Sequence, residues 1–119
     1  MEIKEGMIYA KFKQEQISRE LAQKIVDLRL SFVDGQTLPA IVDGSVVKHL
    51  TKEAREVLSS ERASQHIAAL AVIVRNPVTR AIANFFLKFQ QPSYPFRLFT
   101  DPEKAKQWLK KYQPKEFNL

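Results

Sequence analysis

The side chains that most often carry out catalysis are few in this sequence and form no recognisable catalytic motif. The two histidines, His49 and His66, stand in different parts of the chain, and neither has another histidine or a cysteine three or four residues away. Ser45 lies close to His49, but no oxyanion motif accompanies the pair. Only Asp43 and Asp101 are acids expected at the ligand-binding edge of a sheet, and Asp101 has the position of a helix cap. We therefore expect a non-enzymatic protein without a metal or a cofactor.

A second group of polar residues is placed where small ligands often bind. In open α/β sheets, ligands meet the carboxyl ends of the strands. The residues at that edge that can donate hydrogen bonds to an anion are Arg75, Asn76, Thr79 and Arg80. Helix N-termini also favour anions, and three of them are expected at this edge. The pattern predicts an anion site or, as the simpler alternative, a set of helix caps that solvates the edge.

The elements that position these residues follow from apolar periodicity and capping residues. We expect strands at 2–4, 7–13, 38–43, 67–74 and 96–100. Helices are expected after Ser18, Thr51, Asn76 and Asp101, all of them N-cap residue types. The order ββαβαβαβα predicts a single α/β domain with a mixed, mainly parallel sheet. Segment 67–74 is apolar without alternation, so we place it at the centre of the sheet, whereas 7–13 alternates and should have one face in water.

Two helices carry apolar stripes with specific expectations. In the first helix, Leu21, Ile25, Leu28 and Phe32 form the expected inward face, and Asp34-Gly35 ends the helix. In the third helix, the expected inward residues are Val78, Ile82, Phe85, Phe86 and Phe89. Ala83 and Leu87 widen that apolar arc beyond what one sheet face requires. The extra arc packs on a neighbouring helix or forms a self-association surface at Ala83 and Leu87.

Composition sets further bounds on the function. The chain has 119 residues, a net charge of +6 and no cysteine, which fits a reducing compartment. No apolar run is long enough to span a membrane and the N-terminus does not resemble a secretory signal, so we expect a cytoplasmic protein. The basic residues are scattered, with the densest group on the last helix, and this favours a solvated surface over a nucleic-acid site.

Three segments of the chain resemble a known family. They are IVDGSVVKHLTKEAR (41–55), NPVTRAIANFFLKF (76–89) and PFRLFTDPEKAKQWL (95–109). Together with the element order, they are similar to the STAS domain of bacterial anti-sigma-factor antagonists, and more closely to uncharacterised bacterial SpoIIAA-like (STAS/SEC14-type) domains. The resemblance implies a STAS-like domain over residues 1–114, followed by a tail at 115–119.

The resemblance also carries an expectation for function. Antagonist STAS domains place an Asp-Ser pair, whose serine is phosphorylated, at the helix start that matches Thr51, Lys52 and Glu53 here, so the phospho-switch serine is absent. We expect a regulatory module that recognises another protein, including its own copy. The expected partner surface is formed by Asp43, Ser45, His49, Thr51 and Lys52. The alternative is a binder of a small apolar, lipid-like ligand or of an anionic one.

Overall fold

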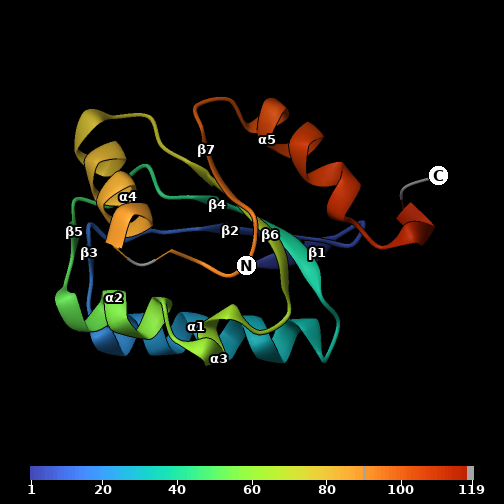
Figure 1. The fold of residues 1–119 in the computed structure, drawn as a ribbon, viewed down its shortest axis with the longest axis horizontal. Helices are drawn as coiled ribbons and strands as arrows, with labels where there is room; N and C mark the ends of the chain where they lie inside the picture. The colour runs from blue at the N-terminus through green and yellow to red at the C-terminus, as the bar shows by residue number, and fades with distance from the viewer. Residues whose placement is uncertain (90, 118–119) are drawn as a thin grey trace.

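The computed structural model describes residues 1–89 and 91–117 of the chain (Figure 1). The strands are β1 (Glu2–Lys4), β2 (Met7–Lys11), β3 (Gln16–Ile17), β4 (Leu38–Asp43), β5 (His49–Leu50), β6 (Ile67–Ile73) and β7 (Phe96–Phe99). The α-helices are α1 (Arg19–Val33), α2 (Lys52–Leu58), α3 (Glu61–Ser64), α4 (Pro77–Phe89) and α5 (Pro102–Leu109). Two 3₁₀ turns, Lys110–Tyr112 and Lys115–Phe117, follow α5. No helix within these residues is both long and apolar enough to cross a membrane.

The main sheet has five strands in the order β1-β2-β4-β6-β7. The β1–β2 hairpin is antiparallel and every other neighbouring pair is parallel, which confirms the predicted mixed, mainly parallel α/β sheet. The middle strand is β4, so the placement of segment 67–74 at the centre was wrong, although β6 is an interior strand with neighbours on both sides. The hairpin turns through Glu5 and Gly6, which both have the positive φ that a tight hairpin turn requires.

The first face of the sheet is covered by α5 (Figure 1). Small residues of β6 and α5 allow the helix to lie close to the strands, and the cluster is Met7, Ile41, Ala69, Ala71, Ile73, Ala105 and Leu109. Trp108 packs beside it, with ring centroids 5.7 Å from Phe99 and 5.4 Å from Tyr112. The buried face of α5 is therefore formed by Ala105 and Leu109. Because Met7 is buried here, the expectation that β2 has one wet face was wrong.

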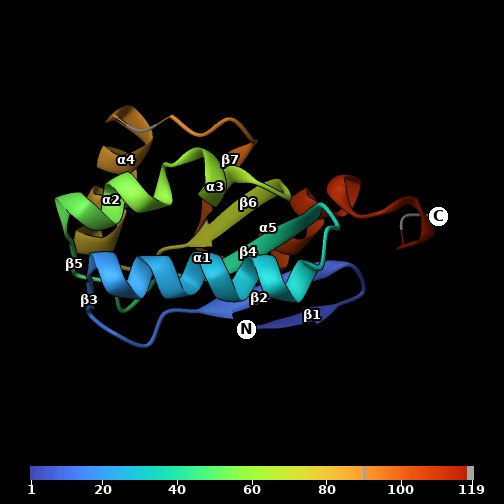
Figure 2. The ribbon, with the colours of Figure 1, turned by 90° about the horizontal axis from the view of Figure 1, so that it is seen from below.

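The second face is covered by a layer of helices in which α1 packs along α2 and α3 (Figure 2). Ser18 caps α1 by accepting a hydrogen bond from the backbone N–H of Leu21, as predicted. The residues of α1 that are buried are Ala22, Val26, Arg29 and Val33. The predicted stripe was therefore placed about one residue away from the buried face, and Leu28 is 45% exposed. The predicted residues and the buried residues each form a mostly apolar row along the helix. Apolar periodicity alone does not show which of two adjacent rows packs against α2.

Three short elements were not predicted. Strands β3 and β5 pair in parallel beside the main sheet, and Thr51 N–H donates to the carbonyl of Ile17 at 3.2 Å. The one-turn helix α3 begins at Ser60, whose hydroxyl accepts from the N–H of Ala63. At the end of the chain, the 3₁₀ turn Lys115–Phe117 lies against the hairpin: a Cβ on Gly6 would sit 2.7 Å from the ring of Phe117.

Candidate functional site

The carboxyl ends of β4 and β6 bring together five polar residues that the sequence had marked. Arg75 pairs with the carboxylate of Asp43 at 3.1 Å, and the N–H of Ser45 donates to the same carboxylate at 2.9 Å. Asn76 donates through Nδ2 to the carbonyl of Ser45 at 2.7 Å, while its Oδ1 accepts from the N–H of Thr79 and caps α4. The five residues therefore form one hydrogen-bonded network, which we call the strand-end network.

The hydrogen bonds of this network have a structural role, because they hold the loop after β4 against the start of α4. Thr79 is buried and its hydroxyl donates to the carbonyl of Val47 at 2.6 Å, which ties the start of α4 to the loop after β4. Partial burial raises the pKa of Asp43, but the hydrogen bonds from Ser45 and the charge of Arg75 outweigh it, so the net pKa lies below its usual value. Three of the four residues expected to bind an anion, Arg75, Asn76 and Thr79, therefore already donate hydrogen bonds within the protein.

The side chains of the other expected site residues lie outside this network. His49 and Lys52 are exposed beside β5 and α2, and the Thr51 hydroxyl accepts from the N–H of Ala54 as a helix cap. Arg80 is exposed and borders a shallow hollow with Asp101 at the start of α5. Side-chain hydrogen bonds therefore join five of the expected site residues, and Arg80 is linked to them through its backbone N–H, which donates to the carbonyl of Asn76 at 3.1 Å. Among the residues described, no three His, Asp or Glu side chains converge into a metal site.

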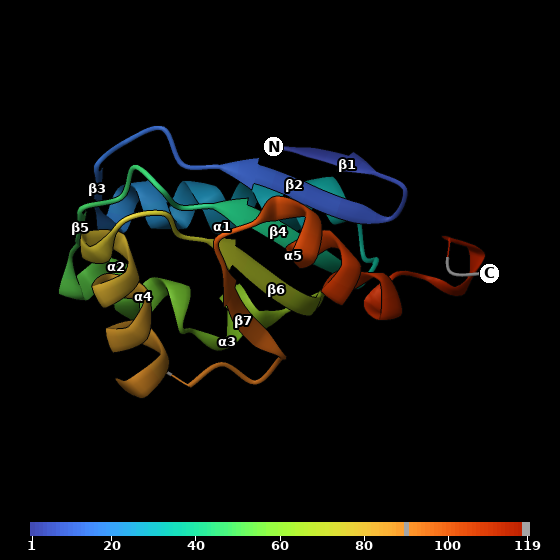
Figure 3. The ribbon, with the colours of Figure 1, turned by 90° about the horizontal axis from the view of Figure 1, so that it is seen from above.

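The buried face of helix α4 differs from the one predicted. Phe86 is buried and Ile82 is half-buried, but Val78 and Phe85 are 51% and 47% exposed, so these two were wrongly placed on the inward stripe. The side chain of Phe89 lies outside the described part of the structure. The helix stands at one end of the molecule beside α2 (Figure 3), where the guanidinium carbon of Arg55 lies 5.1 Å from the centre of the Phe85 ring.

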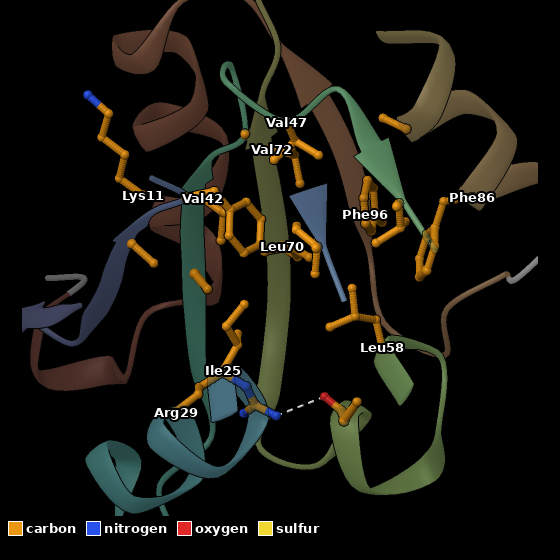
Figure 4. A pocket seen from close by; sticks show the side chains of 18 of the residues that line it. Lys11, Ile25, Arg29, Val42, Val47, Leu58, Leu70, Val72, Phe86 and Phe96 are labelled. Carbon is orange, nitrogen blue, oxygen red and sulfur yellow. Dashed lines mark hydrogen bonds between the residues drawn. The ribbon is translucent and has the colours of Figure 1, made fainter. Parts of the chain in front are cut away.

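Between the sheet and the helix layer lies an apolar cavity of about 300 Å³. Figure 4 shows side chains from both layers pointing into this space. The sheet contributes Ile8, Ala10, Ala40, Val42, Leu70, Val72 and Phe96. The helices contribute Ile25, Val26, Leu58, Ala63, Ile82, Ala83 and Phe86. The cavity is partly open to solvent, because lining residues such as Leu70 and Val72 are only half-buried.

The cavity forms because small residues on the sheet and on the loop after β4 leave space that the overlying helices do not fill. On β6, Ala69 and Ala71 point to α5, and the alternate residues Leu70 and Val72 point to the cavity. Ala10, Ala40 and Gly44 supply small surfaces on the neighbouring strands and the loop after β4. The helices of this layer pack chiefly on one another, since α1 lies along α2, and they leave the space beneath them unfilled.

One end of the cavity is polar. Arg29 of α1 is only 7% exposed, and its terminal nitrogens donate to the carbonyls of Ala63 and Gln65, both at 2.8 Å. Burial lowers the pKa of Arg29, and the nearby Tyr94 partly offsets this effect. Burial also raises the pKa of Tyr94, which lines the same cavity. Neither residue was predicted from the sequence. Arg29 could have been recognised, because it falls on the same helix face as the apolar residues Val26 and Val33.

Comparisons with known proteins agree with the fold. A family model described as a domain of unknown function, DUF7793, matches residues 1–113. A search of curated proteins found no match. Among solved structures, an uncharacterised protein of the DUF3478 family with a SpoIIAA-like fold, from Shewanella loihica PV-4, superimposes with a TM-score of 0.56. It is 17% identical, and the match covers 87% of this chain and 80% of that one. The SpoIIAA-like fold expected from the sequence is confirmed, and at this identity the likeness concerns the fold alone.

Proposed function

This chain belongs to the DUF7793 family, and we propose that it is a binding protein for a small apolar molecule of the lipid class. The molecule occupies the cavity between the sheet and the helix layer. This was the alternative function expected from the sequence, and it now stands ahead of protein recognition. The observation that carries the proposal is the apolar cavity itself.

The size and the lining of the cavity support this choice. A volume of about 300 Å³ lies at the lower end of the range for small-molecule sites, roughly 300–1,000 Å³. Apolar side chains such as Leu70, Val72 and Phe86 line the space, and Leu70 and Val72 are only half-buried in the free protein. An apolar ligand gains burial free energy by covering these side chains.

Substitution of Ala83 by phenylalanine is the test, because Ala83 lines the cavity and a phenyl ring there fills it. The wild type is expected to bind 1-dodecanol and to gain thermal stability, whereas Ala83→Phe binds at least tenfold more weakly while remaining folded. Isothermal titration calorimetry and thermal unfolding measure both effects.

The matched control is Ala81→Phe, which makes the same change on the exposed side of the same helix. It should bind 1-dodecanol as the wild type does. Trp108, the only tryptophan, packs on the opposite face of the sheet with α5, so its emission should not change on binding. Equal weakening in both variants, or no binding by the wild type, contradicts the proposed function.

A second candidate is protein recognition next to the strand-end network. Val46 lies on the loop after β4 and Val78 lies in the first turn of α4, and both apolar side chains are exposed beside the network. Such a rigid, partly apolar surface suits a partner chain, including a second copy. The strand-end residues Asp43 and Ser45 belong to the partner surface expected from the sequence.

Light scattering tests whether the partner is a second copy. If it is, the wild type has the mass of a dimer, and the double variant Val46→Glu, Val78→Glu is a folded monomer because two carboxylates enter an apolar contact. A wild type that is monomeric at high concentration excludes self-association here. A dimer that survives the double variant points to the other expected surface at Ala83 and Leu87, where both side chains are half-buried.

A further inference from the structure

Within residues 1–89 and 91–117, a buried cation in the wall of the cavity has no ion-pair partner. No Asp or Glu among the described residues forms an ion pair with Arg29, although the side chain is more than nine-tenths buried. Buried charges in proteins are normally paired, because the desolvation of an isolated ion is unfavourable. The charge of Arg62, which itself pairs with Asp27, also lowers the pKa of Arg29.

The hydrogen bonds of Arg29 leave it able to bind a further group. A guanidinium has five N–H donors, and Arg29 uses two of them, on the carbonyls of Ala63 and Gln65. Three donors therefore have no acceptor among the described residues, and since no buried side-chain nitrogen there lacks a partner, the unpaired Nε is within reach of water. The two carbonyls fix the guanidinium in place at the junction of α1 and α3. A ligand then meets a cation that is already oriented, with little loss of side-chain entropy on binding.

The position of Arg29 matches the geometry of an amphiphile. In Figure 4, Arg29 lies at the α1 end of the cavity, while Val47 and Phe86 lie far from it across the space. Tyr94 lines the same cavity and interacts electrostatically with Arg29, so two polar side chains lie at this end. Two further polar residues line other parts of the cavity, Lys11 and Thr79. A molecule with one acidic end and a hydrocarbon chain can satisfy the cation and fill the apolar space at the same time.

We propose that the ligand is a single-chain amphiphile with an anionic head, a long-chain carboxylate, whose head group is held by Arg29 and whose chain lies in the cavity. This inference rests on the proposed function and specifies its ligand class. The cavity of about 300 Å³ is too small for a two-chain lipid to enter completely. A carboxylate suits the site better than a phosphate, because Arg29 offers one positive charge in a closely buried position.

The first experiment compares dodecanoate with 1-dodecanol on the wild type at pH 8, by titration calorimetry. Both molecules have the same chain, so the difference between them measures the head group. We expect dodecanoate to bind at least tenfold more tightly. If the alcohol binds as tightly as the acid, the head-group inference is overturned while the proposed function stands. If neither binds, both are overturned. Dodecyl phosphate is the third probe, and tighter binding of it than of dodecanoate overturns the choice of carboxylate.

The second experiment uses variants of α1. Arg29→Gln should remove the preference, so that the acid and the alcohol bind alike, and Arg29→Lys should keep part of it because the charge remains. The matched control is Lys24→Gln, which removes one charge from the exposed side of the same helix and should leave the preference unchanged. An equal loss in both glutamine variants shows a general charge effect and contradicts a specific contact.

A spectroscopic measurement on the wild type keeps the inference testable if Arg29→Gln does not fold. With dodecanoate labelled at the carboxyl carbon, the chemical shift of the bound ligand reports its ionisation as a function of pH. Contact with a buried guanidinium favours the ionised form, so the pKa of the bound carboxyl group should be lower than that of the free acid. A pKa equal to or above that of the free acid overturns the contact with Arg29.

Discussion

Replacing Leu109 by alanine should lower the free energy of unfolding by about 2–5 kcal/mol, the range for buried Leu→Ala changes. Leu109 is fully buried between α5 and the sheet, where it belongs to the closely packed cluster with Ala71 and Ile73. The substitution creates a new cavity that the surrounding strands cannot close. Urea unfolding, followed by the emission of Trp108 in the same cluster, measures the change.

The matched comparison is Leu70→Ala, which makes the same change on the other side of the sheet. Leu70 already borders the apolar cavity and is only half-buried. It therefore has fewer neighbours to lose, and we expect a loss of about 1–2 kcal/mol, below the usual range for a buried leucine. Equal losses in Leu109→Ala and Leu70→Ala contradict the view that the two faces are packed to different densities.

Enlarging a residue should also destabilise the α5 side of the sheet more than the cavity side. Ala71→Leu introduces extra volume where α5 lies close to β6, and overpacking of this kind usually costs about 1–3 kcal/mol. Ala83→Leu adds the same volume to a helix that faces the cavity, where there is space to receive it. We expect this second variant to be as stable as the wild type or more stable, because new apolar contacts form without strain.

Thermal unfolding of the two leucine variants measures the contrast. A destabilised Ala83→Leu protein means that the helix layer closes more tightly over the sheet in solution than the cavity implies. An undisturbed Ala71→Leu protein means that α5 can move away from the sheet. Either result weakens the structural basis for ligand binding, and both together remove it.

Much of the fold could be predicted from the sequence, because capping residues determine where helices begin. Ser18, Thr51 and Asp101 each accept a backbone N–H at the start of a helix, as their residue types predict. The β1–β2 hairpin and the later parallel strands likewise follow from turn residues and apolar runs. The short strand β5 was missed because two residues carry no detectable periodicity.

The candidate site was harder to predict from the sequence than the fold was. Apolar residues that line a cavity have the same types and spacing as those that fill a core, so Leu70 and Phe86 looked like ordinary interior residues. The sequence did predict that Arg75, Asn76 and Thr79 share one edge of the sheet, because parallel strands end together. It could not show that these residues bind one another, since the pairing depends on how the loop after β4 folds back.

The cavity also bears on how the protein responds to hydrostatic pressure. Unfolding eliminates internal voids, so it is accompanied by a decrease in volume that grows with the void space of the native state. Any part of the apolar space of about 300 Å³ between the sheet and the helices that water does not fill should add to this decrease and lower the stability of the native state under pressure. A ligand that fills the space should reduce the volume change, so the bound protein should withstand pressure better than the free one.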